Sequence, residues 1–327
     1  VAINPEDPRY AHLHGCHVVL PLINKEIPIV CDEHADMEKG TGVVKITPAH
    51  DPNDYEVGQR HDLPLVRVFT YDGHMTGAED KAAYEELMAS GKGGKNEPEV
   101  LDCGKYAGMT TEEARKAIVA DMTELGLLKE VEPLKHEVGV CYRHGKTAIE
   151  PMISKQWFVD MKPLAKKAIE TLKAGKIKFH PANKQKVLIN YLENLKDWNI
   201  SRQIPWGIPI PAFQNINDPT DWIFDTRVNE PEIVSEGKTY RRDPDTFDTW
   251  FSSSQWPYIT TSDSDKHFPT SVMETGADLL FQWVGRMIMM SLFVKNEVPF
   301  KEVYMHGMVL DEHGQKMSKS KGNVINP

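Results

Sequence analysis

Three consecutive segments near the C-terminal end decide the fold: Val303–Leu310, Asp311-Glu312-His313-Gly314, and Lys316-Met317-Ser318-Lys319-Ser320-Lys321-Gly322. The order predicts a strand, a turn, and then a mobile, positively charged loop. Ammonium groups and hydroxyls on such a loop bind phosphate oxygens, and they stabilise charge that develops in a transition state. The alternative is a solvated Lys/Ser tail, which an ordered string directly after a strand disfavours. We therefore expect an α/β fold with a phosphate-binding loop.

An apolar helix is expected just before this strand, over residues 277–294. Asp278, Gln282 and Arg286 recur at i, i+4 and i+8, so a regular α-helix would place them on one polar stripe. Gly276 would let a ligand approach the N-terminus of the helix. The alternative is a core helix with one satisfied polar edge. Because Gln282 and Arg286 interrupt the apolar run, we expect a buried helix and no membrane span.

The first half of the chain reads mostly as short strands separated by Pro, Gly or acidic residues. Asp72-Gly73 suits a hairpin turn, and residues 79–90 favour a helix. Thr110 and Glu113 form a capping box that begins a further helix. The expected strands cover residues 17–23, 27–31, 42–47 and 63–70.

The texture changes near residue 150. A helix is expected over Met161–Ala174, ended by Gly175. Residues 176–202 then hold six Lys or Arg against two acidic residues, the best local basic patch in the chain. Such a run is either a solvated helix face or a contact surface for an anionic partner.

Length and composition further limit the number of domains and the class of protein. The chain has 327 residues, 40% of them hydrophobic, which suits about two globular domains and excludes global disorder. Its 38 Lys+Arg and 48 Asp+Glu give a net charge of −10, which argues against coating DNA through global charge. The four cysteines are scattered without a paired framework, so we expect a reducing, cytoplasmic location. The chain begins at Val1 without an initiator Met and stops at Pro327, so we expect part of a longer protein.

Several ordered motifs carry a family resemblance. Lys316–Ser320 is similar to the KMSKS signature of class I aminoacyl-tRNA synthetases. The segments 197–203 and 248–253, with Trp206-Gly207 between them, resemble blocks of the Ile/Val/Leu group. Thr249–Ser253 and the apolar Asp278–Trp283 resemble the valyl-specific members more than the isoleucyl or leucyl ones. The resemblance covers essentially the whole chain.

The stretch Gly40–Glu56 resembles the core of the editing domain that these enzymes carry as an insertion. Val and Thr are nearly isosteric, so one hydrophobic pocket separates them weakly and a second, hydrolytic site is needed. By the resemblance, Asp54 anchors the α-ammonium of the aminoacyl ester, and Asp51 senses the Thr hydroxyl. Lys45 and Thr47 stand beside them. Without the motif, Asp51 and Asp54 would read as an Asx-turn after a proline.

Histidine and cysteine residues suggest further roles that the residues alone leave open. His50 is either a general base or a hydrogen-bonded structural residue, and the latter is the commoner case. His12, His14, Cys16 and His17 look like metal ligands, yet no second ligand set follows. Cys141 lies where some relatives begin a zinc knuckle, but the later Cys pair is missing. We therefore expect no metal.

The resemblance also assigns residues of the synthetic site. It implies catalytic roles in the mobile loop, an ATP-binding segment before the apolar helix, and Trp side chains around the amino acid. Core packing would explain the two Trp equally well. The catalytic residues are Lys316, Ser318 and Lys319; the ATP-binding residues are Gly276, Asp278 and Lys319; the amino-acid pocket holds Trp206 and Trp250.

The resemblance implies an α/β fold in which a β-rich editing (CP1) domain is inserted into a Rossmann-type catalytic domain. We expect editing residues in 1–149, a connecting segment in 150–199, and the C-terminal half of the catalytic domain in 200–327. The HIGH motif of the class and the threonine-rich strip of the editing pocket are missing from this sequence. We therefore expect this chain alone not to aminoacylate tRNA.

The expected function is ATP-dependent attachment of valine to tRNA(Val), with hydrolysis of mischarged Thr-tRNA(Val). The expected partners are tRNA(Val), valine and ATP with Mg²⁺, on a monomer without a membrane. An isoleucyl-type synthetase is the first alternative. A free-standing hydrolase of mischarged tRNA is the second, although it would not need Lys316–Ser320, and a tRNA- or nucleotide-binding module is the third.

Overall fold

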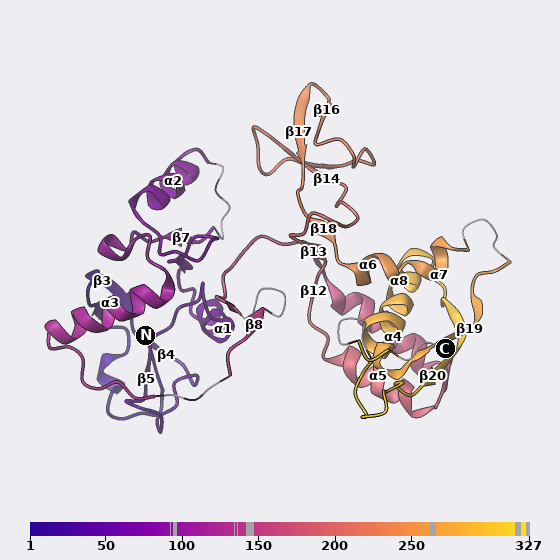
Figure 1. Ribbon diagram of the computed structural model, residues 1–327, viewed down its shortest axis with the longest axis horizontal. Helices are drawn as coiled ribbons and strands as arrows, with labels where there is room; N and C mark the ends of the chain where they lie inside the picture. The colour runs from indigo at the N-terminus through magenta and orange to yellow at the C-terminus, as the bar shows by residue number, and fades with distance from the viewer. Residues whose placement is uncertain are drawn as a thin grey trace. The chain divides into compact units, whose positions relative to one another are not determined.

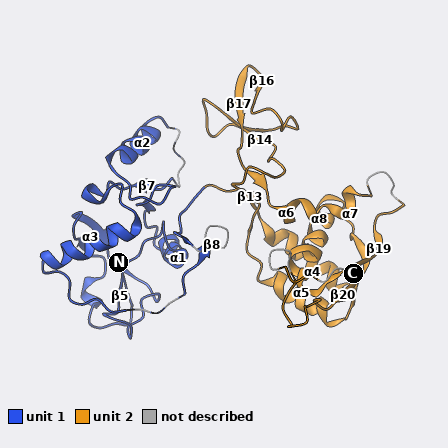
Figure 2. Cartoon of the chain, in the orientation of Figure 1, with its two compact units in different colours: residues 1–154 blue, residues 155–327 orange. Residues whose placement is uncertain are grey.

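The computed structural model describes residues 1–91, 93, 97–133, 135, 137–141, 147–261, 266–317 and 322–324. The chain divides into two compact units, Val1–Ser154 and Lys155–Pro327 (Figure 2). Figure 1 labels their helices and strands along the chain. The segment expected to connect two domains, residues 150–199, crosses this boundary, and its role stays a prediction.

The described residues of unit 1 form short strands and three α-helices. Strand β1 pairs in parallel with β4 and antiparallel with β5, and the small core beside them contains Ala2, Ile46 and Val57. The elements are β1 Ala2–Ile3, the 3-10 helix η1 Ala11–Leu13, β2 His17–Leu20, β3 Lys25–Pro28, β4 Val30–Cys31, β5 Val43–Val44, α1 Pro52–Arg60, β6 Val66–Arg67, α2 Ala78–Ala89, β7 Glu99–Val100, the 3-10 helix η2 Gly104–Tyr106, α3 Thr111–Glu124, β8 Val140–Cys141 and β9 Thr147–Ala148.

The expected strands of unit 1 all exist but are shorter than the apolar runs suggest. Leu22 and Asn24 adopt positive φ angles between β2 and β3, so the first run turns back on itself instead of continuing to residue 23. The turn at Asp72-Gly73 is confirmed by the bridge between Phe69 and Met75. The capping box is confirmed: the Thr110 hydroxyl accepts from the Glu113 N–H, and the Glu113 carboxylate accepts from the Thr110 N–H.

Unit 2 is built on a parallel sheet in the strand order β11-β20-β19. Strand β19 passes through one apolar helical segment and returns as β20, which is a βαβ connection. The elements are β10 Phe158–Val159, α4 Met161–Lys173, β11 Lys178–His180, α5 Asn183–Glu193, β12 Trp198–Asn199, β13 Ser201–Arg202, β14 Ala212–Asn215, β15 Trp222–Phe224, β16 Glu232–Ser235, β17 Lys238–Arg242, β18 Thr246–Phe247, α6 Thr249–Ser253, α7 Trp256–Ile259, β19 Thr270–Gly276, η3 Ala277–Leu279, η4 Leu280–Gly285, α8 Arg286–Val294 and β20 Phe300–His306.

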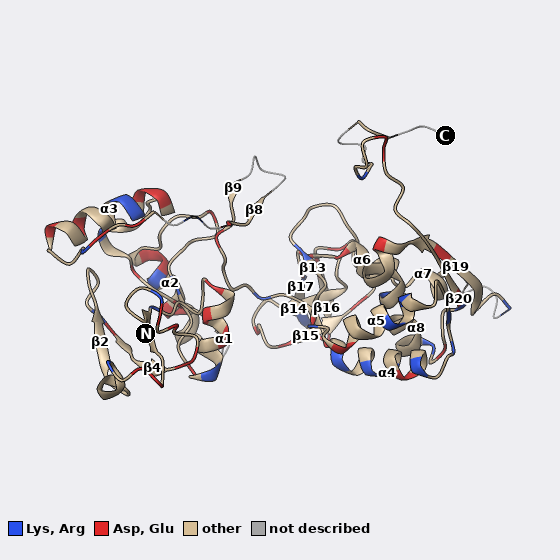
Figure 3. Cartoon of the chain, turned by 90° about the horizontal axis from the view of Figure 1, so that it is seen from below, with Lys and Arg blue, Asp and Glu red and all other residues tan. Residues whose placement is uncertain are grey.

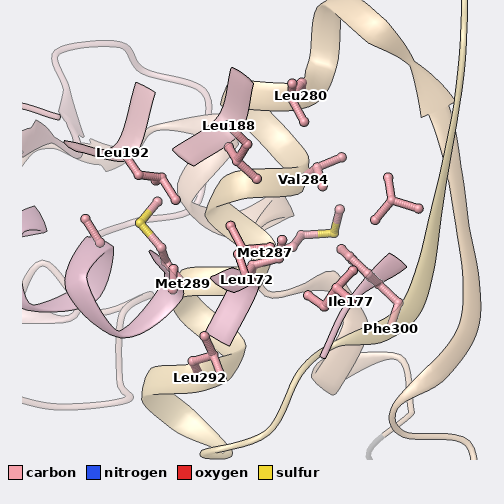
Figure 4. Packing of buried hydrophobic residues seen from close by; sticks show 14 of the residues in the cluster. Leu172, Ile177, Leu188, Leu192, Leu280, Val284, Met287, Met289, Leu292 and Phe300 are labelled. Atoms are coloured by element: carbon pink, nitrogen blue, oxygen red, sulfur yellow. The ribbon is translucent and has the colours of Figure 1, made fainter. Parts of the chain in front are cut away.

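The main core of unit 2 lies between this sheet and helices α4, α5 and α8. Met287 and Ile288 are fully buried, and Figure 4 shows Met287 among Leu172 and Ile177. The expected helices 161–174 and 277–294 both exist, so these parts of the sequence analysis are confirmed in outline. Residues 212–242 form a separate antiparallel sheet in the order β15-β14-β17-β16, with its own small core.

The segment 277–294 departs from the expected regular α-helix. It begins as the 3-10 helix η3, continues as the π-helix η4, and becomes α-helical only at Arg286. A π-helix closes i→i+5 hydrogen bonds and is wider than an α-helix, so the rotation per residue is smaller through Leu280–Gly285. By length and composition this one stretch of the described chain could cross a membrane, but half of it is buried, as in a core helix.

Truncation of Met287 tests the core of unit 2. We expect Met287→Ala to lower the free energy of unfolding by about 2–5 kcal/mol, because it leaves a cavity in a closely packed core. All seven Trp residues lie in unit 2, so Trp fluorescence in a urea titration reports on this unit. Phe293→Ala is the control on the same helix, since Phe293 is 68% exposed. A midpoint for Met287→Ala equal to that of the control would contradict this packing.

A buried carboxylate ties the end of strand β4 to the end of helix α1. Asp32 accepts two hydrogen bonds from Arg60, at 3.0 and 2.9 Å, and contacts His61 at 2.9 Å. The Arg60 guanidinium in particular holds the pKa of Asp32 well below its usual range. A carboxyl whose pKa is lower in the folded state stabilises the fold above its ordinary pKa, and this contribution disappears as the pH falls.

The pH dependence of unit 1 follows from this arrangement. We expect Asp32→Asn to lower the free energy of unfolding by about 1.5–3 kcal/mol at neutral pH, since a charged hydrogen-bonded pair is lost. The difference from wild type should shrink as the pH falls below about 4, where the wild-type contribution also disappears. Far-UV circular dichroism during urea titration at several pH values measures both effects. A difference that stays constant down to pH 2 would rule out the proposed origin.

Candidate functional sites

The first candidate site lies at the carboxyl edge of the parallel sheet in unit 2. Strands β19 and β20 end opposite each other at Gly276 and His306. The helical segment that follows β19 begins at the same edge, with Asp278 in its first turn. Ligands of open α/β sheets bind outside the carboxyl ends of the strands, where helix N-termini also point. This edge is therefore the place in unit 2 where a nucleotide would be expected.

The start of the Lys/Ser loop reaches this edge. The Lys316 Nζ lies 3.1 Å from Asp278 Oδ2, across 38 residues of sequence. The turn that precedes the loop is confirmed by the hydrogen bond from the Gly314 N–H to the Asp311 carbonyl. Asn323 donates to the Asp311 carboxylate and to the Lys316 carbonyl, so both ends of the loop are tied together. Ser318 and Lys319 lie outside the described residues.

Gly276 is required by a close approach at this site. A Cβ atom there would lie 2.7 Å from Asp278 Oδ1 and 3.5 Å from His306 Cε1. Any larger residue would push the Asp278 carboxylate away from the strand end. The resemblance assigns Gly276 and Asp278 to ATP binding and Lys316 to catalysis, and the structure brings these three residues together.

The second candidate site is a hollow of about 730 Å³ in unit 2, beside Trp250. Asp248 lies at its wall and caps helix α6, where its Oδ1 accepts from the Trp250 N–H. The other carboxylate oxygen of Asp248 accepts from Trp198 Nε1 at 3.0 Å and pairs with Arg202 at 3.0 Å. The guanidinium of Arg286 stacks over the Trp198 ring at 3.7 Å. These contacts hold Asp248 in place, and Asp248 in turn positions the backbone of Trp250 at the start of α6. The sequence analysis assigned Asp248 no role in the site, because an aspartate that caps a helix does not by itself indicate a ligand-binding residue.

The structure separates two groups of residues that the sequence analysis placed together. Trp250 lines the hollow, whereas Trp206 is 89% exposed and is not among the residues that line it. Gln282 and Arg286 line the hollow, but Asp278 faces Lys316 instead. Asp278 and Gln282 are both exposed and Arg286 is half-buried, so the single polar stripe stays a prediction, with Asp278 engaged by Lys316 and the other two residues at the hollow.

The third candidate site lies in unit 1 at the start of helix α1. Asp54 is 7% exposed, and its Oδ2 accepts from the Thr47 N–H at 2.7 Å and from the Thr47 hydroxyl at 3.1 Å. Burial lowers the pKa of the Lys45 ammonium, and the charge of Asp54 partly opposes that change. Lys45 and Thr47 also line an apolar cavity of about 140 Å³. Two of the expected editing residues, Lys45 and Thr47, thus lie beside the buried carboxylate of a third, Asp54.

Asp51, the fourth expected editing residue, caps the same helix. Its Oδ1 accepts from the Asn53 and Asp54 N–H groups at 2.8 and 3.1 Å. The structure therefore contains the local capping geometry that the residues alone would favour. This arrangement positions Asp54, since Asp54 occupies the first turn of the helix that Asp51 begins.

Two histidines complete the surroundings of Asp54. His34, which the sequence analysis did not single out, places Nε2 3.6 Å from Asp54 Oδ1. His50 accepts from the Val68 N–H with Nε2 at 3.0 Å, so its Nδ1 carries the proton and donates to the Pro151 carbonyl. Burial lowers the pKa of His50. With both ring nitrogens engaged, His50 has the geometry of a structural residue.

The expected absence of a metal can be examined only in the part of the chain that the structure describes. Within it, no group of three His, Cys, Asp or Glu is placed to hold a metal ion. This covers His12, His14, Cys16 and His17, whereas the residues directly after Cys141 lie outside the described ranges.

Comparison with known proteins gives the family. The chain is 45% identical to a valine–tRNA ligase of Treponema denticola, and the match covers all of this chain and 34% of that protein. A valine–tRNA ligase of Carboxydothermus hydrogenoformans is 47% identical, with 100% and 35% covered, and one of Fusobacterium nucleatum is 44% identical, with 100% and 35% covered. The chain spans about a third of the length of these curated relatives.

A family model described as tRNA synthetases class I (I, L, M and V) matches residues 33–327. This range takes in the Asp54 site, the hollow beside Trp250, and the Lys316–Asp278 pair. It also agrees with the mixed α/β architecture and with the parallel sheet of unit 2. The chain therefore belongs to the class I tRNA synthetases, in the group of the isoleucine, leucine, methionine and valine enzymes.

Proposed function

We propose that this chain supplies the editing unit and the second half of the synthetic site of a synthetase that attaches valine to tRNA(Val). The observation that carries the proposal is the meeting of Lys316 and Asp278 at the carboxyl edge of the sheet. The choice of valine is supported by the names of the relatives that match the whole chain.

In the proposed synthetic reaction, the valine carboxylate attacks the α-phosphate of ATP in line and pyrophosphate leaves. The protein contributes orientation and neutralisation of charge, without a covalent nucleophile. Asp278 would accept hydrogen bonds from the ribose of ATP, and Lys316, with Lys319 and Ser318, would contact its phosphates. Trp250, held by Asp248, would form one wall of the pocket for the valine side chain, whereas Trp206, which does not line the hollow, stays a prediction for this pocket.

Mg²⁺ fits this proposal as a companion of ATP. Since no acidic group of three could hold a metal among the described residues, the ion would enter on the ATP phosphates. There it would neutralise phosphate charge during the displacement. We further propose a cytoplasmic, monomeric protein.

The proposed editing reaction is hydrolysis of Thr-tRNA(Val) in unit 1. Asp54 Oδ2 is occupied by Thr47, so Oδ1 is the oxygen that would receive the α-ammonium of the threonyl ester. The Asp51 carboxylate would accept the Thr hydroxyl, which valine lacks. A site built to hydrogen-bond a hydroxyl rejects the analogue without it. Lys45 adds positive charge near the ester, where negative charge develops as water attacks.

An isoleucyl-type synthetase would contain the same kind of sites. Pyrophosphate exchange with valine and with isoleucine, measured on the protein that contains this chain, distinguishes the two. Exchange that depends on isoleucine and not on valine would overturn the proposed specificity.

Neutralisation of Asp54 tests the editing site. Asp54→Asn keeps an oxygen for Thr47 but removes the charge that would hold the α-ammonium, so we expect Thr-tRNA(Val) hydrolysis to slow at least tenfold. Deacylation of Thr-tRNA(Val) over time is the measurement. Glu56→Gln is the matched control, because Glu56 is an exposed acid on the same helix. Normal clearance of Thr-tRNA(Val) by Asp54→Asn would exclude this anchor.

Removal of the loop lysines tests the synthetic site. We expect Lys316→Ala and Lys319→Ala each to lower valine-dependent pyrophosphate exchange at least tenfold, or about 1.4 kcal/mol of transition-state stabilisation. Thr-tRNA(Val) hydrolysis in the same variants should persist, since the proposed editing residues lie in unit 1. Lys301→Ala, on an exposed position of β20, is the control. Unchanged exchange in both loop variants would remove these lysines from the site.

A further inference from the structure

Positive charge is concentrated in one part of unit 2. Residues 161–202 carry ten Lys or Arg and three Asp or Glu, a local charge of +7 in a chain whose net charge is −10. Figure 3 shows Lys and Arg along α4 and near α5. The basic segment thus extends beyond the patch at 176–202 and includes the whole of α4. A separation of charge of this size favours contact with an anionic partner.

Three of these lysines form one stripe on α4. Lys162, Lys166 and Lys173 are separated by four and seven residues, which places them within about 40° of one another around a helix of 3.6 residues per turn. All three side chains are exposed, while Ala168 and Leu172 on the opposite face are fully buried. The stripe extends over about 16 Å along the helix axis. We call these three residues the α4 lysine stripe.

The charges of the α4 lysine stripe form few ion pairs with other described residues of the protein. Lys162 and Lys166 form no ion pair with any described residue, and Glu170 flanks the stripe without pairing with either. Lys173 lies 3.3 Å from Glu193, but both side chains are about half exposed or more, and such surface pairs contribute little. The contacts inside unit 2 therefore do not explain why three lysines share this face.

The spacing and surroundings of the stripe identify the class of partner. The three ammonium groups are spread too widely to hold one small anion. A membrane contact would need large apolar side chains beside the lysines, and residues 160–186, all of them described, expose none. A nucleic-acid backbone fits both observations, because it presents a continuous row of phosphates and needs no apolar contact.

We propose that the α4 lysine stripe binds the phosphate backbone of tRNA, which it positions on unit 2 without reading its sequence. The identity of the RNA rests on the proposed function, whereas the backbone contact rests on the charge distribution alone. The stripe therefore contributes affinity that depends on salt and not on the valine identity of the tRNA.

The test is tRNA binding by the 327-residue chain over a range of salt concentrations. The triple variant K162Q/K166Q/K173Q removes three charges and keeps good helix formers. We expect binding at about 50 mM salt to weaken about tenfold or more, and the slope of log K against log salt to fall by about 2–3. K162R/K166R/K173R should restore both quantities. In unit 1, K81Q/K105Q/K116Q removes the same charge from lysines already paired with Glu85, Asp121 and Glu112, and should change binding far less.

The outcomes separate this proposal from the proposed function. Binding of tRNA(Val) and of an unrelated tRNA should be weakened equally, and both measurements are independent of valine activation or Thr-tRNA hydrolysis. If the slope of log K against log salt is unchanged in K162Q/K166Q/K173Q, the stripe does not contact tRNA and the proposal is overturned. An equal loss of tRNA affinity in the unit 1 control variant would overturn it as well. Absence of salt-dependent tRNA binding by the wild-type chain would also overturn it. Loss of binding to anionic vesicles, with tRNA binding retained, would assign the stripe to a membrane instead.

Discussion

The burial of one apolar segment against the parallel sheet is the constraint on which the geometry of unit 2 depends. Val284, Met287 and Ile288 are fully buried, so the segment between β19 and β20 must lie across the sheet. That position makes the connection between the two strands a crossover, and it sends both strands out at the same edge. Asp278 and the loop after β20 meet there because each directly follows the end of one of these two parallel strands.

The same segment shows how a buried surface can override a local pattern. The apolar spacing predicted a helix, and the helix exists, because burial in the core needs only an apolar surface. The regular α-helical geometry expected for the whole segment is not kept, because Leu280–Gly285 adopts a π-helix. In the packed fold a Cβ atom at position 285 would lie 3.0 Å from Leu188 of α5, so Gly285 lets these two elements approach closely. Tertiary packing, which the periodicity cannot contain, brings Lys316 to Asp278.

In the candidate sites, too, local arrangements could be predicted from the sequence and contacts between distant segments could not. The cluster of Lys45, Thr47 and Asp54 could be predicted, because the members lie within ten residues and Asp51 begins the helix that orients them. Contacts between distant segments could not be predicted, and His34 beside Asp54 and Asp248 behind Trp198 are two examples. His34 has no distinctive sequence context, and Asp248 lies in the family-like segment 248–253 without any signal for its contacts. Each gains its role from a strand or helix that arrives from elsewhere. The motifs indicated the regions of the sites, and only the fold supplied the supporting residues.

The surroundings of Asp54 determine which kind of ligand unit 1 would bind. A buried carboxylate must be satisfied, and Thr47 satisfies only one of its oxygens. Lys45 lies near but is itself destabilised as a cation by burial, and His34 lies just beyond hydrogen-bond distance of the second oxygen. That oxygen is therefore incompletely paired in a site that has positive charge available but not bound to it. A ligand that brings its own ammonium group would complete the pairing at little cost in rearrangement, because Thr47 and the cap at Asp51 already hold the carboxylate in place.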